Sequence, residues 1–286
     1  MRKILIQLDN DRFPSVFDAV TAYDAGAEVL LQYGNVQPSD VRDLVYGAMF
    51  TRGPADLHNS AVFIGGTDVS AGEAMLQAAR DSFFGPLRVS VMLDANGCNT
   101  TAAAAVVGIL SEGSVEGKKV VVLAGTGPVG QRAAALLAGE GAQVVITSRR
   151  LDRAEQTSAA LRERFGVQVT AAQAATDEET AQVLEGAHAA LSAGAAGVTL
   201  LPAAIWKGHP ELRILADVNA VPPLGVEGAE VTWAGEDVEG KRAYGAIGIG
   251  DFKMKIHKRC LARLFEANDL ILDAEEVFAL AKELRM

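Results

Sequence analysis

The chain has 286 residues, of which 49% are hydrophobic and 22% are charged. This composition excludes a largely disordered protein, and the length predicts two domains because one domain takes about 150 residues. Asp and Glu number 36 against 26 for Lys and Arg, which gives a formal net charge of −10. Such an acidic surface repels nucleic acid and anionic lipid, so we expect neither nucleic acid nor a membrane as a partner.

Cysteine use and hydropathy indicate a reducing, aqueous compartment. Cys98 and Cys260 are far apart and offer neither a disulfide framework nor a metal-binding spacing, so we expect buried thiols and no metal. No apolar run reaches the roughly 18 residues that cross a bilayer. Residues 1–9 are too short for the apolar core of a signal peptide and predict a first strand. These features predict a cytoplasmic protein.

The first hundred residues alternate apolar strands with helices, which predicts parallel strands joined by right-handed crossovers. Proline in a first turn and Ser or Asp at an N-cap mark where the helices start. The expected strands are residues 4–8, 28–32, 61–64 and 88–93, and the expected helices are residues 14–25, 38–46 and 68–84.

The next segment, residues 100–110, is almost entirely small and apolar and predicts a close-packed helix that connects two domains. A second series of strands follows it, with a charged amphipathic helix at residues 153–165. The strands expected in this part are residues 119–124, 143–147, 167–171, 188–193, 213–217 and 244–247.

The tail of the chain predicts two amphipathic helices, residues 255–265 and 274–284. Terminal helices of this kind usually pack against an earlier domain, here across the cleft between the two domains. The expected fold class is therefore α/β. Its parts are an N-terminal domain of parallel strands (1–110), a Rossmann dinucleotide-binding domain (111–254) and C-terminal helices that pack back (255–286).

A glycine-rich turn follows the apolar strand at residues 119–124. Gly125, Gly127 and Gly130 fit the pattern G-x-G-x-x-G, and an alanine-rich helix comes next. The first glycine makes the turn, the second lets the backbone approach a pyrophosphate, and the third allows close helix–strand packing. The alternative is a turn without a ligand. The predicted phosphate-binding residues are Gly125, Thr126, Gly127, Pro128, Val129 and Gly130.

The end of the second strand predicts which dinucleotide binds. NAD sites place an acid about 20 residues past the motif, where it binds the ribose 2′-hydroxyl. This chain has Ser148, Arg149 and Arg150 there, and no acid before Asp152. A hydroxyl and guanidinium groups favour a 2′-phosphate, so we predict NADP; the alternative is that both arginines are only solvated.

Eight segments carry a further pattern, and those outside the glycine motif are more specific than the glycines themselves. They are residues 14–18 (PSVFD), 33–36 (YGNV), 51–53 (TRG), 83–86 (FFGP), 94–101 (DANG and NTT), 123–130 (LAGTGPVG), 217–225 (DVNAVPPLG) and 245–250 (GAIGIG). Together they resemble the NADP-dependent methylene-tetrahydromethanopterin dehydrogenases of one-carbon metabolism over nearly the whole chain. This resemblance implies two α/β domains with a cleft between them and a homo-oligomer, trimeric or higher. The family often has Gly-Arg-Lys where this chain has residues 148–150, and the positive charge is kept.

The reaction implied by the resemblance is reversible hydride transfer between NADP and the one-carbon bridge of a reduced pterin. Methylene-tetrahydromethanopterin becomes the methenyl form, and some members also use methylene-tetrahydrofolate. Loss of hydride from a carbon between two nitrogens leaves a cation that the substrate itself stabilises, so no general acid or base is needed. The step needs the reacting atoms held about 3–3.5 Å apart. No Ser-His-Asp triad is evident in the sequence, which agrees with direct transfer.

We expect the pterin to contact segments of both predicted domains. Phe17 would pack on the flat ring, and polar side chains would bond its amide-like edge. The predicted substrate-binding residues are Phe17, Asp18, Asn96, Thr100, Thr101 and His257. The alternatives are a solvated acid for Asp18 and helix capping for one of the two threonines. Ala193 and Asn219 complete the expected cofactor-binding set.

Lys253 is the predicted catalytic residue. By resemblance it matches the lysine that faces the pterin, and a helix from about Asp251 would place Lys253 and His257 on one face, with Lys255 solvated. A full positive charge beside a forming cation opposes the reaction. Lys253 would therefore either bond a pterin or solvent oxygen away from the reacting carbon, or be buried with a lowered pKa. The alternative is an ordinary surface lysine.

Two other functions remain open from the residues alone. A shikimate-type NADP dehydrogenase fits residues 147–155, but it should carry a serine pair near the first helix and a catalytic lysine. Lys3 is the one lysine in the first hundred residues. A non-catalytic NADP-binding regulator would bind the nucleotide tightly without pterin turnover.

Overall fold

The structure is a computed structural model that describes residues 1–285. Two compact units make up the chain: Met1–Thr100 joined by the C-terminal segment from Met254, and Thr101–Lys253. The division falls inside two helices, α4 (Cys98–Leu110) and α9 (Ala246–Arg263). Among the described residues no helix is both long and apolar enough to cross a membrane.

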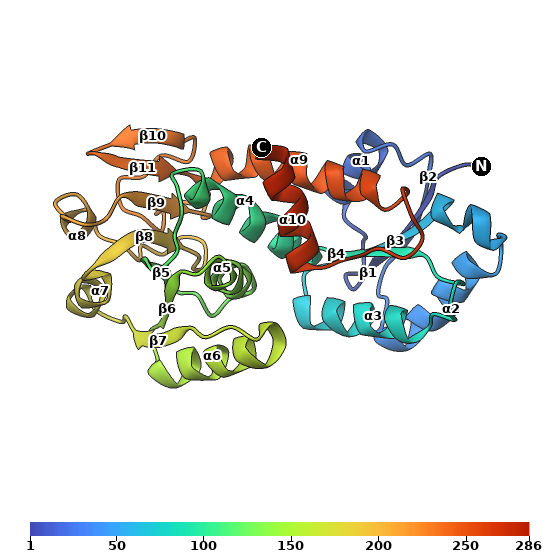
Figure 1. Cartoon of the computed structure of the whole chain (residues 1–286), viewed down its shortest axis with the longest axis horizontal. Coiled ribbons are helices and arrows are strands. Elements are labelled where there is room, and N and C mark those ends of the chain that lie inside the picture. Colours follow the sequence, from blue (N-terminus) through green and yellow to red (C-terminus); the bar gives the residue numbers. More distant parts are fainter. Residues whose placement is uncertain (286) are drawn as a thin grey trace. The chain divides into compact units, whose positions relative to one another are not determined.

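The first unit is built on a five-stranded sheet in the order β12-β4-β3-β1-β2, and every neighbouring pair is parallel. β3 is buried along its whole length because helices cover both faces of the sheet, which explains its unbroken apolar sequence. In Figure 1, α1 and α3 lie on opposite sides of these strands. The strands are β1 (Ile4–Asp9), β2 (Val29–Tyr33), β3 (Ser60–Gly65), β4 (Ser90–Leu93) and β12 (Ile271–Leu272).

Two helices of this unit begin at caps expected from the sequence, whereas the N-cap of the second helix is Gln37. The Ser15 side chain accepts from Asp18 N at 3.2 Å, and Asp68 accepts from Ala71 N at 3.1 Å. The helices are α1 (Val16–Asp24), α2 (Pro38–Met49), α3 (Val69–Asp81) and α10 (Ala274–Arg285), with 3-10 turns at Pro54–Asn59 and Ala95–Gly97. The expected alternation of strands and helices is confirmed.

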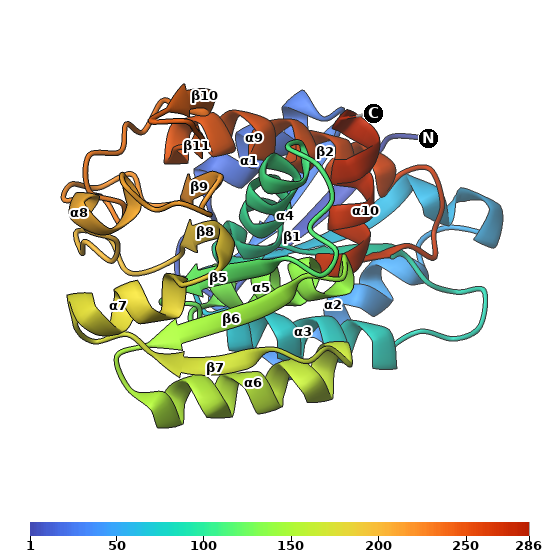
Figure 2. The ribbon, with the colours of Figure 1, turned by 60° about the vertical axis from the view of Figure 1, so that its left-hand side comes forward.

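The second unit is built on a seven-stranded sheet in the order β10-β11-β9-β8-β5-β6-β7, antiparallel only between β10 and β11. Figure 2 shows β8, β5, β6 and β7 side by side. The first strand of the unit lies in the middle, and the chain builds outward from it in both directions. In sheets of this kind nucleotides bind beside such a reversal, here at the carboxyl ends of β5 and β8. The strands are β5 (Lys119–Leu123), β6 (Gln143–Ser148), β7 (Thr170–Gln173), β8 (Ala187–Ser192), β9 (Ile214–Asp217), β10 (Ala234–Val238) and β11 (Lys241–Tyr244).

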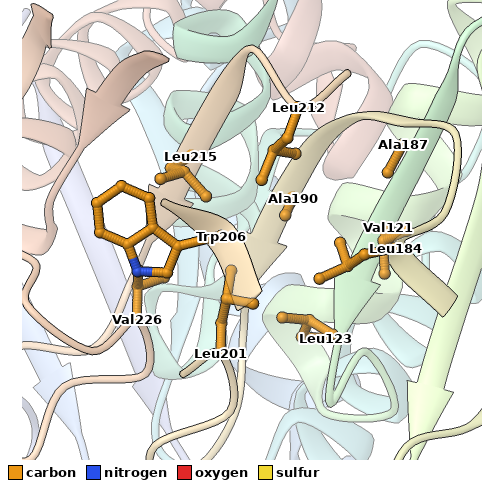
Figure 3. Packing of buried hydrophobic residues seen from close by; sticks show 10 residues of the cluster. All are labelled: Val121, Leu123, Leu184, Ala187, Ala190, Leu201, Trp206, Leu212, Leu215 and Val226. Atoms are coloured by element: carbon orange, nitrogen blue, oxygen red, sulfur yellow. The ribbon is translucent and has the colours of Figure 1, made fainter. Parts of the chain in front are cut away.

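An apolar core packs around β5, β8 and β9 of this sheet (Figure 3). Trp206, at the end of a short helix, is fully buried and its Nε1 donates to Glu227 O at 3.0 Å. Val121, Ala190 and Leu215 belong to the same cluster of buried residues. The helices of the unit are α5 (Pro128–Gly139), α6 (Leu151–Phe165), α7 (Asp177–Leu184) and α8 (Ala203–Trp206).

One expected strand is wrong. Residues 244–247 do not form a strand, because β11 ends at Tyr244 and α9 begins at Ala246. The sequence predicts that this helix starts near residue 251, so it begins about one turn earlier than expected. Gly245 and Gly248 lie directly against the backbone of residues 230–234, and a Cβ at either would overlap it. Backbone packing therefore requires these glycines.

The short strand β12 is not among the predicted strands. It adds the C-terminal segment to β4, and Val91 N donates to Leu270 O at 2.9 Å. Two residues are too few to show an apolar alternation in the sequence. Both cysteines are buried thiols, as expected, and burial raises the pKa of the Cys260 thiol, which keeps it protonated and unreactive.

Candidate active site

The glycine-rich turn joins the carboxyl end of β5 to the N-terminus of α5. A Cβ at Gly130 would lie 2.6 Å from Gly125 Cα, so the two backbones touch and only glycine fits. Gly127 is the N-cap of α5 and Pro128 its first residue. A Cβ at Gly127 would meet nothing closer than Ala193 O at 4.0 Å, so open space lies over this part of the turn.

This arrangement fits a dinucleotide pyrophosphate. The N–H groups in the first turn of a helix have no partner inside the helix, and the helix dipole favours an anion there. The buried Thr147 hydroxyl accepts from Ala124 N at 3.0 Å and so ties the turn to β6. Ala193 N donates to Leu123 O at 3.0 Å, which places the predicted cofactor residue Ala193 next to the turn.

The three residues predicted for a 2′-phosphate differ in what they contact. Ser148 is buried at the end of β6, and its Oγ accepts from Arg150 N at 3.3 Å. Arg150 pairs with Asp152: its Nε lies 3.0 Å from Asp152 Oδ1, and a second, shorter contact joins the same groups. This hydrogen bonding raises the pKa of Arg150 and lowers that of Asp152. Arg149 is exposed and makes no ion pair within residues 1–285.

Asn219, also predicted for the cofactor, is buried in the loop that follows β9. Its Oδ1 accepts from Val221 N at 3.0 Å and its Nδ2 donates to Pro223 O at 3.4 Å. The side chain thus holds its own loop in shape, at the carboxyl end of the strand next to β8.

The first unit gathers ionisable side chains at the carboxyl ends of its central strands. His257 on α9 is buried, with Nδ1 at 3.8 Å from Asp94 Oδ2 and Nε2 at 3.9 Å from Asp18 Oδ1. Its ring centroid lies 5.5 Å from that of Phe63 and 6.3 Å from that of Phe17. The predicted residues Phe17, Asp18 and His257 are therefore neighbours, and Phe17 and part of Asp18 face solvent.

Thr100 and Asn96 occupy different positions from this group. Thr100 is buried, and its Oγ1 donates to Asp94 Oδ2 at 2.6 Å; the side chain that accepts from backbone N–H groups in the first turn of α4 is that of Asp94, so the hydroxyl of Thr100 does not cap the helix. Asn96 is exposed in a left-handed conformation with φ 53°, and its N donates to Gly66 O at 2.6 Å.

Thr101 and Lys253 belong to the second unit and are its first and last residues, on α4 and α9. Lys253 is half-buried whereas Lys255 is exposed, in line with the expectation that Lys255 is the solvated one.

Two buried acids are absent from the site predicted by sequence. Asp94 follows β4, and its Oδ1 accepts from Asn99 N at 2.9 Å and from Thr100 N at 3.1 Å. Asp9 ends β1, and its carboxylate accepts from Asp11 N at 2.9 Å and from Ser15 N at 3.1 Å. Each stands at the carboxyl end of a strand that the sequence predicts, and this position is the signal that could have found them.

A seven-stranded, mainly parallel sheet with a glycine-rich turn at its switch point defines a Rossmann-type dinucleotide-binding fold. Comparisons with known proteins place the chain more closely. A sequence profile described as "Methylene-tetrahydromethanopterin dehydrogenase, N-terminal" matches residues 16–96.

Two relatives from Methylorubrum extorquens match over almost their whole length. "Bifunctional protein MdtA" is 51% identical over 285 residues, and "NAD(P)-dependent methylenetetrahydromethanopterin dehydrogenase" is 32% identical over 293 residues, each match covering 99% of both chains. The chain belongs to the methylene-tetrahydromethanopterin dehydrogenase family, and the resemblance drawn from the sequence is confirmed.

Solved structures resemble the fold. A shikimate 5-dehydrogenase from Listeria monocytogenes, in complex with shikimate and NAD, superimposes with a TM-score of 0.56 at 16% identity, covering 100% of this chain and 96% of that one. At this identity the likeness is one of architecture, and it confirms the predicted α/β dehydrogenase fold.

Proposed function

We propose that the chain catalyses reversible, NADP-dependent oxidation of methylene-tetrahydromethanopterin to the methenyl form, and that it also accepts methylene-tetrahydrofolate. The observation that carries this proposal is the full-length relationship to the two Methylorubrum proteins, whose names state a methylenetetrahydromethanopterin dehydrogenase and a bifunctional protein. The chain's own residues agree, because the glycine-rich turn is followed at the end of β6 by a hydroxyl and two guanidinium groups.

NADP in particular is the proposed cofactor, whereas the relatives support a nicotinamide dinucleotide without deciding between NAD and NADP. Arg149 supports it most, because its guanidinium is exposed and not engaged by a carboxylate. Arg150 would have to share its charge between the phosphate and Asp152. A charge-assisted hydrogen bond to phosphate is among the stronger contacts that an arginine makes.

The pterin is proposed to contact Phe17 and Asp18, whereas His257, which is buried beside both, is proposed to support them. An exposed aromatic ring beside a carboxylate suits a flat heterocycle with N–H donors on its edge. Thr101 and Lys253 are proposed as further contacts on the family resemblance, with Lys253 in the catalytic role.

The residues act by binding and orientation. The nicotinamide cofactor supplies the hydride acceptor when bound. The α5 N-terminus would hold the pyrophosphate, and Arg149 the 2′-phosphate. Burial of His257 between Asp18 and Asp94 gives this part of the substrate site a fixed geometry, which is what a direct transfer needs.

We also propose a cytoplasmic homo-oligomer, trimeric or higher. Val16, Val20 and Tyr23 share one face of α1 and are more than half exposed in the single chain, at 75%, 56% and 54%. A second copy of the chain would cover this face. Light scattering on the purified protein measures the mass that tests it.

Absorbance of the reduced cofactor tests the function. The purified chain is given NADP with methylene-tetrahydromethanopterin, methylene-tetrahydrofolate or shikimate in separate reactions. We expect NADPH with the methylene-pterins and none with shikimate. Oxidation of shikimate would support the shikimate-type alternative, and tight NADP binding without any turnover would support the regulator.

A further inference from the structure

The Asp217 carboxylate closes a loop at the end of β9 in the second unit. Asp217 is buried, with only 2% of its surface exposed. Its Oδ1 accepts from Asn219 N at 3.0 Å and its Oδ2 accepts from Val226 N at 2.8 Å. One side chain thus binds both ends of the loop formed by residues 219–226.

Ser192 and Gly225 complete the enclosure of this carboxylate. Ser192 ends β8 in register with Asp217 on β9. Its buried hydroxyl meets no acceptor in good geometry among residues 1–285, yet it faces the carboxylate closely enough to lower the pKa of Asp217. A Cβ at Gly225 would overlap Ser192 Oγ and lie 2.9 Å from Asp217 Oδ1, so the loop can pass here only as glycine.

Burial and hydrogen bonding act in opposite directions on this group. Burial raises the pKa of Asp217, and the backbone N–H groups of Val226, Asn219 and Gly225 together with Ser192 lower it by a smaller amount. No charged side chain of the described residues contributes to the shift. A protonated carboxyl has lost an acceptor site, so the loop is held best when Asp217 is ionised.

The loop lies on the side of the sheet where a nicotinamide would bind. β8 and β9 flank β5 on the side opposite β6, which carries the residues proposed for the 2′-phosphate. In a doubly wound sheet the dinucleotide crosses the switch point, so its nicotinamide half lies over the carboxyl ends of these two strands. Ala193 directly follows β8, and Asn219 lies two residues beyond the end of β9.

We propose that Asp217 is a positioning residue for the nicotinamide half of the cofactor, holding the 219–226 loop through its two backbone bonds. The proposal rests on the proposed dinucleotide-binding function. It assigns Asp217 no contact with the reacting atoms. Ser192 and Gly225 serve it by keeping the carboxylate in place.

The test compares D217N with E163Q, which alters an exposed acid of α6 in the same unit. Asparagine keeps the shape but replaces one acceptor oxygen with an NH2 group that cannot accept. We expect D217N to weaken binding of NADP and NAD alike by about tenfold or more, measured by titration calorimetry, with E163Q at the wild-type value. Arg149→Ala should weaken only NADP.

The pH profile gives a readout that a merely structural role would not move. Removing the Ser192 hydroxyl in S192A should raise the pKa of Asp217, because this hydroxyl faces the carboxylate and lowers its pKa. We expect kcat/KM for NADP to fall on acidification as Asp217 becomes protonated, and this fall should begin at higher pH in S192A than in the wild type. At high pH, kcat/KM should drop far less in S192A than in D217N. If D217N does not fold, the pH profile of S192A by itself tests the role of Asp217.

The outcomes separate the two proposals. A wild-type chain that binds neither dinucleotide overturns the proposed function. A wild-type chain that binds and turns over NADP, with folded D217N binding as tightly and S192A giving an unmoved acid limb, overturns the role of Asp217. An equal loss of NADP and NAD affinity in D217N, together with the shifted limb in S192A, supports it.

Discussion

Replacing Gly130 with alanine should displace the phosphate-binding end of α5. The new Cβ would lie 2.6 Å from Gly125 Cα and 2.9 Å from Gly125 C and O. Carbon atoms in contact are ordinarily about 3.5–4.0 Å apart, so the helix start and the turn must separate by about 1 Å. Backbone cannot rotate aside as a side chain would. Overpacking of this size costs about 1–3 kcal/mol of unfolding free energy.

The same displacement should weaken binding of the cofactor. The N–H groups that would bind the pyrophosphate belong to this turn, and losing one hydrogen bond to a charged group, worth about 1.5–3 kcal/mol, corresponds to about a tenfold to 150-fold rise in Kd. Titration calorimetry with NADP and urea unfolding measure the two effects. Gly139→Ala is the matched control, because Gly139 lies in the last turn of the same helix with nothing within 4 Å of a Cβ.

Gly139→Ala should therefore bind NADP normally and be as stable as the wild type or up to about 1 kcal/mol more stable. The reasoning is refuted if Gly130→Ala matches this control in both NADP affinity and stability. Close contact between the turn and α5 would then have no part in building the nucleotide site.

Three further predictions address the cofactor, the catalytic residue and the core. Arg149→Ala should raise KM for NADP about tenfold to a hundredfold without changing KM for NAD, and Arg150→Ala should do less because a neighbouring carboxylate already engages it; equal, wild-type KM values in both would contradict the NADP assignment. Lys253→Met should lower kcat strongly with near-normal NADP binding, whereas exposed Lys255→Ala should turn over normally, so indistinguishable variants with wild-type kcat would remove Lys253 from the mechanism. Trp206→Ala should lower the free energy of unfolding by about 3–5 kcal/mol in a urea titration, because it empties a fully buried site and leaves Glu227 O without its donor; a loss under 1 kcal/mol would show that the cluster collapses around the gap.

Local chemistry along the chain determines much of this protein. Apolar strands, caps such as Ser15 and Asp68, and glycines that interrupt the chain predict the alternation of strands and helices, because each of these signals acts within a few residues. The strand–turn–helix context of Gly125 and Gly130 predicts the nucleotide fold for the same reason. The arginines after β6 follow the motif at a spacing that the fold requires.

Features that join distant segments depend on the tertiary structure. The early start of α9 follows from the packing of Gly245 and Gly248 against residues 230–234, and the strand β12 exists only through its pairing with β4. The same holds for the groups around His257, which come from α1, the end of β4 and α9.

Asp217 is the clearest example of a residue whose surroundings the sequence does not predict. Its sequence position marks only the end of a strand, and its burial, its two backbone partners and the need for glycine at residue 225 appear only once β8 and β9 lie side by side. Parallel strands bring their carboxyl ends to one edge of a sheet, so residues far apart along the chain meet there. Periodicity reports which face of an element is apolar, but it carries no information about which distant side chain will stand opposite.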